Sequence, residues 1–149
     1  MDITVSFPGG KRVDAAVGGH VVHTDQPVTG GGEDAAPAPF DVFLASLATC
    51  AGIYVLGFCQ ARNIPTAGIR LVQHHDHDPV THTLRGVELE IELPAGFPEK
   101  YKDAVVRAAE GCKVKKLLAS PPAVAVRSTL AAGLLALAPV GETALAIQH

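Results

Sequence analysis

Cys50 and Cys112 are the residues of this sequence whose type and setting are best suited to chemistry. A thiolate is a nucleophile, and two thiols that meet in a folded protein can be oxidised to a disulfide and reduced again. A third cysteine, Cys59, follows Cys50 by nine residues in a stretch that reads as a helix. That spacing puts two side chains on opposite helix faces. We therefore expect Cys59 to be an inert core residue, because free cysteine is often buried.

The residues around Cys112 favour an activated thiol. Gly111 suits the left-handed conformation that ends a helix, and a new helical segment begins at Cys112. A helix N-terminus and cationic neighbours both lower the pKa of a thiol, and Lys113, Lys115 and Lys116 follow directly. Local sequence alone thus favours Cys112 over Cys50 as the thiolate, the alternative being a buried cap residue.

A second set of reactive side chains lies between residues 74 and 82. It contains His74, His75, Asp76, His77, Asp78 and His82. Histidine and carboxylate are metal ligands, but this spacing matches no specific metal motif and falls at the tip of an expected hairpin. We therefore expect no bound metal and no cofactor, and retain a metal-binding module as the third of three interpretations.

Composition narrows the class of protein. The chain has 149 residues, of which 48% are hydrophobic and 18% charged, with a net charge of −3. These values are typical of a globular domain and give no sign of nucleic acid as a partner. The N-terminus lacks the basic and apolar regions of a secretory signal, and three cysteines do not indicate a disulfide framework. We therefore expect a cytoplasmic protein.

Hydrophobic periodicity and turn residues predict strands followed by helices. Strands are expected at 3–7, 12–17 and 20–23, a plain loop at 26–39, a long hairpin at 68–93 and a further strand at 123–128. Helices are expected at 40–63, 99–110 and 112–118. Residues 129–149 form an extension of unknown role that we assign to the same domain.

The helix expected at 40–63 has no charged residue between 42 and 59. This uncharged stretch is long enough to be considered as a transmembrane helix. Its small and polar residues and the amphipathic strands beside it favour instead a central, fully buried helix in a protein without a membrane partner.

Two stretches carry a resemblance to a known family. Residues 38–50, APFDVFLASLATC, are similar to a helix with the pattern Pro-x-Glu-Leu-Leu-x-Ala-Ser-Leu-x-x-Cys. Residues 111–118, GCKVKKLL, are similar to a Cys-Pro-Val-His-x-x-Leu segment. With both in the right order and separation, residues 1–128 resemble the OsmC/Ohr family, the osmotically inducible and organic hydroperoxide resistance proteins.

The resemblance implies an α+β fold, with antiparallel sheet packed on a long central helix and a second helix, in an intertwined homodimer. It also implies a thiol peroxidase. The cysteine matching Cys50 attacks a small organic hydroperoxide and becomes a sulfenic acid, and the cysteine matching Cys112 resolves it as a disulfide. An external dithiol then reduces the disulfide.

Two further site residues come from the same resemblance. Peroxidase members hold the thiolate with an arginine of the N-terminal strands and orient that arginine with a glutamate at the start of the long helix. The arginine position falls on or near Val17, so Arg12 is the candidate of that region, and Asp41 is the candidate acid. Lys113 stands where proline is usual. These departures leave a non-catalytic protein, which binds a small apolar ligand or senses redox state, as the second interpretation.

Overall fold

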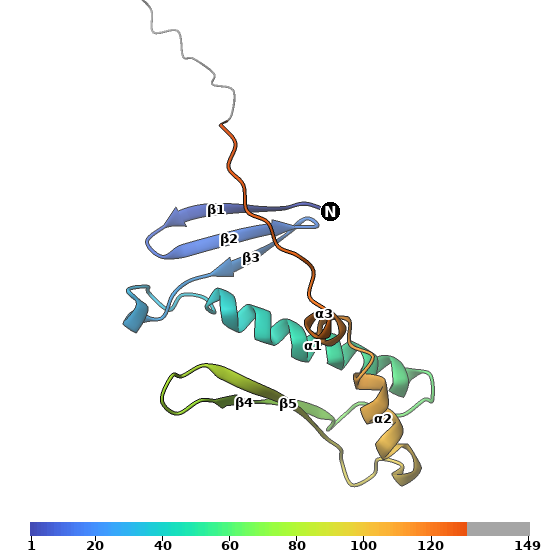
Figure 1. Cartoon of the computed structure of the whole chain (residues 1–149). Helices are drawn as coiled ribbons and strands as arrows, with labels where there is room; N and C mark the ends of the chain where they lie inside the picture. Colours follow the sequence, from blue (N-terminus) through green and yellow to red (C-terminus); the bar gives the residue numbers. More distant parts are fainter. Residues whose placement is uncertain (131–149) are drawn as a thin grey trace, which may run out of the picture.

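The structure is a computed structural model, and it describes residues 1–130. A long helix, α1 (Pro39–Gln60), runs between a three-stranded sheet and a two-stranded hairpin (Figure 1). Two shorter helices, α2 (Lys102–Ala109) and α3 (Lys113–Ala119), follow the hairpin in the chain, and both contact α1. The α+β class with antiparallel sheet is thus confirmed.

The N-terminal sheet is a meander of β1 (Ile3–Gly9), β2 (Arg12–Val17) and β3 (His20–Thr24). Glycines in the left-handed region make both turns, as the Gly-Gly pairs predict. The register aligns Val5 with Ala15 and Ala15 with Val22, so apolar side chains share one face. That face is bare in the single chain, since Ile3 is 59% and Val5 49% exposed.

Asp25 organises the loop between β3 and α1, which contains a short 3-10 turn (Val28–Gly30). Its carboxylate is fully buried and accepts hydrogen bonds from the backbone N–H groups of Gln26, Glu33 and Ala35 at 2.8, 3.0 and 3.2 Å. These bonds, that of Ala35 above all, lower the pKa of Asp25. The loop expected as a plain connection is therefore tied to a single carboxylate.

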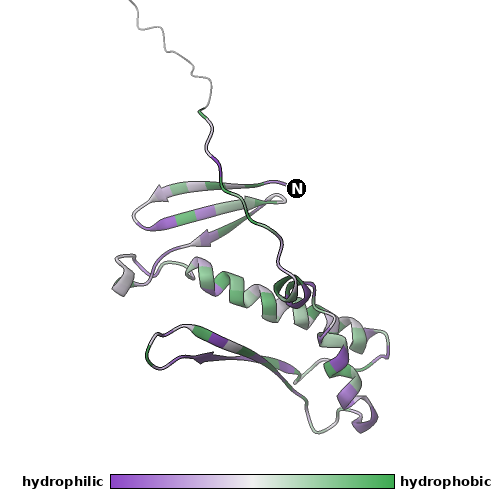
Figure 2. Ribbon diagram, viewed as in Figure 1, coloured by the Kyte–Doolittle hydropathy of each residue, from purple (hydrophilic) through white to green (hydrophobic). Residues whose placement is uncertain are grey.

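Helix α1 is buried along one stripe rather than all round. Pro39 and Asp41 occupy its first turn, as expected of a helix start. The buried positions recur every three or four residues and are Leu44, Leu47, Ala51, Val55 and Cys59. The ribbon of α1 is mostly apolar along its length (Figure 2). Some of these apolar side chains are exposed, including Ile53 at 60% and Phe40 at 54%. The expectation of a fully buried helix therefore does not hold for the single chain. By length and composition alone, α1 is long and apolar enough to span a membrane.

The hairpin of β4 (Arg70–His77) and β5 (Leu84–Glu92) supplies the surface that covers this stripe. Leu71 pairs with Ile91, and both pack against the core of α1. The acidic positions of β5, Glu88, Glu90 and Glu92, are exposed, as the alternation predicts. Strand β4 reaches His77, so the loop at the tip is shorter than expected.

The helix predicted at 99–110 is a 3-10 turn (Glu99–Tyr101) followed by α2, and the next is α3. The strand predicted at 123–128 is wrong for the described chain, where residues 121–130 form neither helix nor strand. Val124 and Val126 are 86% and 96% exposed, which is the expected state of a strand-forming sequence that has no neighbouring strand to pair with. Of the predicted extension, residues 131–149 lie outside the described residues.

Candidate active site

Cys50 and Cys112 are brought together although 62 positions of sequence separate them. Leu47, Ala51 and Cys112 are buried in one apolar cluster that joins α1 to the turn before α3, and Cys50 packs against that cluster. Cys50 is half-buried, whereas Cys112 is fully buried. Both are free thiols. The two cysteines therefore differ in their exposure to solvent, and Cys50 is the more accessible one.

The Cys112 side chain is the N-cap of α3. Its sulfur accepts a hydrogen bond from the backbone N–H of Lys115, with an N–S distance of 3.5 Å. Its own S–H donates to the carbonyl oxygen of Leu47 on α1, with an S–O distance of 3.8 Å. The first bond caps α3, and the second docks the start of α3 onto the turn of α1 that precedes Cys50.

The start of α3 also acts directly on Cys50. The pKa of the Cys50 thiol is lowered, first by the backbone N–H of Val114 and next by the neighbouring side chain of Cys112. The backbone N–H and the charge of Lys113 add smaller contributions, and burial opposes them. Hydrogen bonds to the anionic sulfur therefore favour Cys50 as a thiolate.

This arrangement corrects the interpretation based on local sequence. The positive end of α3 and its lysines pointed to Cys112 as the activated thiol. In the folded chain, N–H groups of Lys113 and Val114 are directed to Cys50 from a neighbouring element. Sequence proximity could not show this, because Cys50 reaches the start of α3 only through the packing of α1.

Cys59 has a different environment. It is fully buried with Val55, Phe97 and Val105, in a cluster distinct from the one that holds Cys112. Burial raises the pKa of its thiol, which disfavours the nucleophilic thiolate. The nine-residue spacing thus correctly assigned Cys59 to the core.

Arg12 and Asp41 are not joined to the thiols within the described chain. The Nε of Arg12 donates to the carbonyl of Gly9 at 3.5 Å, and its charge contributes to the lowered pKa of Asp25. Asp41 is exposed in the first turn of α1. Among residues 1–130, neither takes part in an ion pair, and the influences on Cys50 come from α3. The roles assigned to Arg12 and Asp41 stay predictions.

A cavity of about 440 Å³ lies beside the buried thiol, between β5 and the three helices. Cys112 is part of its wall, and charged side chains stand at Arg85, Glu110 and Lys115. Most of the wall is apolar and is made by Leu47, Leu84, Val87, Leu89, Ile91, Val106, Ala109 and Leu118. A site of this size and lining suits a small apolar molecule.

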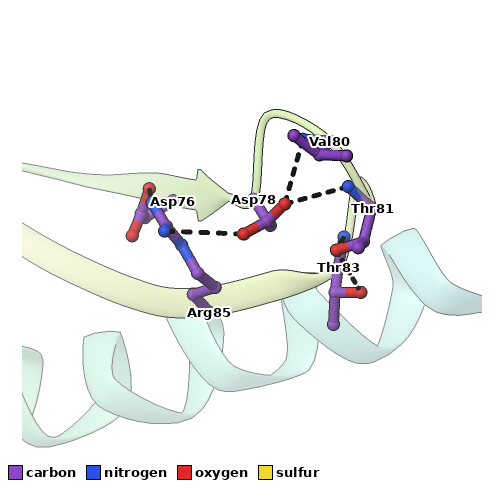
Figure 3. A network of polar contacts seen from close by, with 6 residues as sticks. All are labelled: Asp76, Asp78, Val80, Thr81, Thr83 and Arg85. Carbon is purple, nitrogen blue, oxygen red and sulfur yellow. Dashed lines mark hydrogen bonds and ion pairs between the residues drawn. The ribbon is translucent and has the colours of Figure 1, made fainter.

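The histidine-rich hairpin does not form a metal centre in the part of the chain that the structure describes. His75 faces Gln73 and His77, whereas His74 contacts Glu90 across the strands. The two aspartates at the tip are engaged elsewhere, since Arg85 pairs with both, at 3.1 Å to Asp76 and 3.7 Å to Asp78 (Figure 3).

Asp78 also stabilises the turn itself. It accepts the backbone N–H groups of Val80 and Thr81, both at 2.9 Å (Figure 3). These bonds, that of Thr81 first, lower the pKa of the Asp78 carboxyl. The polar residues of the tip thus have a structural role that accounts for the aspartates without a metal.

Comparison with solved structures reveals the same fold elsewhere. The chain is similar to a protein from Psychrobacter arcticus named for an osmotic-stress-induced and detoxification response, with a TM-score of 0.65, 22% identity, and coverage of 76% of this chain and 85% of the other. It is also similar to an OsmC-like protein from Mycoplasma pneumoniae, with a TM-score of 0.63, 17% identity, and coverage of 80% and 87%.

A third similar structure is an organic hydroperoxide resistance protein OsmC from Legionella pneumophila, with a TM-score of 0.50, 19% identity, and coverage of 80% and 90%. At these identities the likeness shows the fold alone. No curated protein matches the chain significantly. The family model described as OsmC-like protein matches residues 30–127, a span that holds both thiols and the helices that position them. The chain therefore belongs to the OsmC-like protein family.

Proposed function

We propose that this protein is a thiol-dependent peroxidase that reduces small organic hydroperoxides. The observation that carries the proposal is the convergence of two free thiols at the start of α3, where backbone N–H groups favour the thiolate of Cys50. Cys50 is the more accessible sulfur, which suits the attacking role, and Cys112 is buried against it, which suits the resolving role.

The chemistry takes three balanced steps. The Cys50 thiolate attacks the terminal oxygen of the hydroperoxide; the O–O bond breaks, Cys50 becomes a sulfenic acid, and the alkoxide leaves and takes a proton to become the alcohol. Cys112 then attacks the Cys50 sulfur, so that a disulfide forms and water is released. An external dithiol reduces the disulfide by two exchange steps, returns both thiols and becomes a disulfide itself. That reduction fits a protein of the reducing cytoplasm.

The apolar cavity beside Cys112 supports an organic rather than an inorganic peroxide as substrate. Its wall is mostly made of leucine, valine and isoleucine side chains from β5 and the helices. Burial of an alkyl or aryl group there would gain roughly 25 cal/mol per Å² of apolar surface. Hydrogen peroxide has no such surface, so we propose that the cavity favours organic substrates.

A homodimer is part of the proposal. Ile3, Val5 and Phe7 of β1 and Ile53 of α1 are between 49% and 80% exposed in the single chain. Large exposed apolar surfaces mark interaction sites, and a second copy offers the same surface in return. A clean monomer in light scattering at micromolar concentration would contradict this part of the proposal.

The test is a count of free thiols after a stoichiometric dose of tert-butyl hydroperoxide to the reduced protein. We expect two of the three thiols to disappear, with Cys59 retained. The control Cys59→Ala should also lose two thiols. Cys112→Ser should lose one and carry a dimedone-trappable sulfenic acid at Cys50. A Cys50→Ser variant that consumes peroxide as fast as the unaltered protein refutes the mechanism.

The second candidate function is a redox sensor that reacts once without turnover. It is favoured by the positions of Arg12 and Asp41, which lie outside the thiol cluster of the described chain. The two functions separate in one assay, in which a tenfold excess of hydroperoxide is supplied with dithiothreitol. A peroxidase consumes the excess at a rate well above that of dithiothreitol alone, whereas a sensor reacts with about one equivalent and adds little to the dithiothreitol rate.

A further inference from the structure

The turn that carries Cys112 lies unusually close to α1. A Cβ atom placed on Gly111 would lie 3.0 Å from both Cδ1 and Cε1 of the Tyr54 ring and 3.0 Å from the carbonyl oxygen of Ala108. Few real Cβ contacts are that short. Gly111 does not have a positive φ, so the expected left-handed helix stop is not its reason for being glycine. The glycine is required for close approach instead.

Tyr54 is placed to control the thiol pair. It follows Cys50 by four residues, so both side chains lie on neighbouring turns of the same face of α1. Gly111 directly precedes Cys112. The Tyr54 ring therefore contacts the turn at the residue that precedes the buried Cys112. Cys50 lies one helical turn of α1 before Tyr54.

The turn has little freedom to move away from the ring. Consecutive backbone N–H groups of Gly111 and Cys112 donate to Ala108 and Ala109 at 3.0 and 3.1 Å. On the other side, the S–H of Cys112 donates to the carbonyl of Leu47. A displacement at Gly111 is therefore transmitted to Cys112 and to the first N–H groups of α3.

We propose that Tyr54 and Gly111 are positioning residues that fix how closely the Cys112 turn approaches Cys50. The proposal rests on the proposed function, in which these two thiols react with each other. Tyr54 acts through its ring, as a spacer of fixed thickness, and Gly111 acts by having no side chain. Neither residue reacts; together they set the separation of the elements that carry the two sulfurs.

The test is a double-mutant cycle read by the pH profile of Cys50 alkylation with iodoacetamide, mapped by peptide mass. In Gly111→Ala, the added methyl group pushes the turn outward, and we expect the alkylation rate at pH 7 to fall about two- to threefold relative to the high-pH plateau. Tyr54→Leu removes the spacer and should cause a similar fall. In the double variant the methyl group fills the space that the ring leaves, so most of the loss should be recovered.

Two controls isolate the contact. Gly96→Ala adds the same methyl group to another non-helical glycine, into open space, and should leave Cys50 unchanged. Tyr54→Phe keeps the ring and should behave as the unaltered protein; a loss there would assign the effect to the hydroxyl and overturn the spacer role. A merely structural role would lower thermal stability without moving the pH profile of Cys50.

Further results of these experiments would each contradict a part of the proposals. A Gly111→Ala profile equal to that of Gly96→Ala, or a double variant no better than Gly111→Ala, overturns the proposal. If Gly111→Ala does not fold, an unchanged profile in Tyr54→Leu overturns it. Failure of the unaltered protein to react with hydroperoxide would refute the peroxidase function alone, because alkylation reports the positioning independently.

Discussion

Replacement of Cys112 tests whether hydrogen bonding or lysine charge activates Cys50. The Cys112 thiol ranks second among the influences that lower the pKa of Cys50, whereas the charge of Lys113 ranks last. Cys112→Ala removes the S–H donor, and Lys113→Gln removes the charge but keeps the backbone N–H. We therefore expect Cys112→Ala to have the larger effect on Cys50.

The size of the effect follows from the energy of one hydrogen bond. A hydrogen bond is worth about 0.5–1.5 kcal/mol net, and about 1 kcal/mol is reasonable for a weak thiol donor beside a half-buried anion. Because 1.36 kcal/mol corresponds to one pKa unit, we expect about fivefold slower alkylation of Cys50 in Cys112→Ala at pH 7. Lys113→Gln should slow alkylation by less than about twofold, because charges near solvent are screened.

The assay is the initial rate of iodoacetamide alkylation at Cys50 between pH 5 and pH 10, at low and at high salt. Circular dichroism checks that both variants are folded. Cys112→Ser serves as the matched control, because it keeps a hydrogen-bond donor beside Cys50 and should preserve most of the rate. If Lys113→Gln slows the reaction more than Cys112→Ala does, or if high salt abolishes the activation, charge rather than hydrogen bonding is responsible and the reasoning is refuted.

Three further predictions concern the elements around the site. Leu47→Ala removes a buried side chain of the thiol cluster and should lower the free energy of unfolding by about 2–4 kcal/mol in urea titration, against less than about 0.5 kcal/mol for the exposed control Val80→Ala. The pKa of Asp25 is lowered in the folded state, so the stabilisation from its carboxylate is present above the pKa of the unfolded carboxyl and is lost as the pH falls through the pKa of the folded state. Asp25→Asn should therefore be less stable than the unaltered protein at pH 7, and its melting temperature should change less between pH 2 and 5 in thermal melts. Arg12→Gln should leave the alkylation profile of Cys50 unchanged, because the Cys50 pKa is lowered by α3; a several-fold slower reaction would show that Arg12 reaches Cys50 in the assembled protein.

Local sequence predicted most elements because their signals are local. The strand at 12–17 was correct to the residue, and the long helix was predicted within three residues of its ends. The strand predicted at 123–128 is wrong because a β-prone sequence becomes a strand only when it pairs with another strand, and among the described residues it pairs with none. Hydrophobic periodicity can show that a segment favours the strand conformation, but it cannot show which distant strand the segment pairs with.

The site was predictable as a pair of thiols but not as a mechanism of activation. The family resemblance correctly brought Cys50 and Cys112 together. It could not reveal that the amides of Val114 and Lys113 face Cys50, because backbone groups have no sequence signature. The sequence predicts a left-handed backbone at Gly111, but in the structure the close approach of Tyr54, and not the backbone angle, excludes a side chain.

The side chain of Cys112 takes part in both halves of the proposed cycle, so replacing it changes two steps at once. The Cys112 side chain lowers the pKa of Cys50 before the peroxide arrives, and its sulfur attacks the Cys50 sulfur afterwards. Loss of Cys112 therefore slows the first step as well as abolishing the second. Cys112→Ser separates the two, because it keeps a donor but cannot form the disulfide.

The comparison of two variants then measures the coupling. If Cys112→Ser forms sulfenic acid at nearly the unaltered rate while Cys112→Ala forms it about fivefold more slowly, the resolving thiol also activates the attacking one. Equal rates in both variants would mean that the amides of α3 suffice and that Cys112 acts only after the peroxide is cleaved. In either case the groups that lower the pKa of Cys50 are carried by the start of α3, so the placement of α3 against α1 determines how reactive Cys50 is.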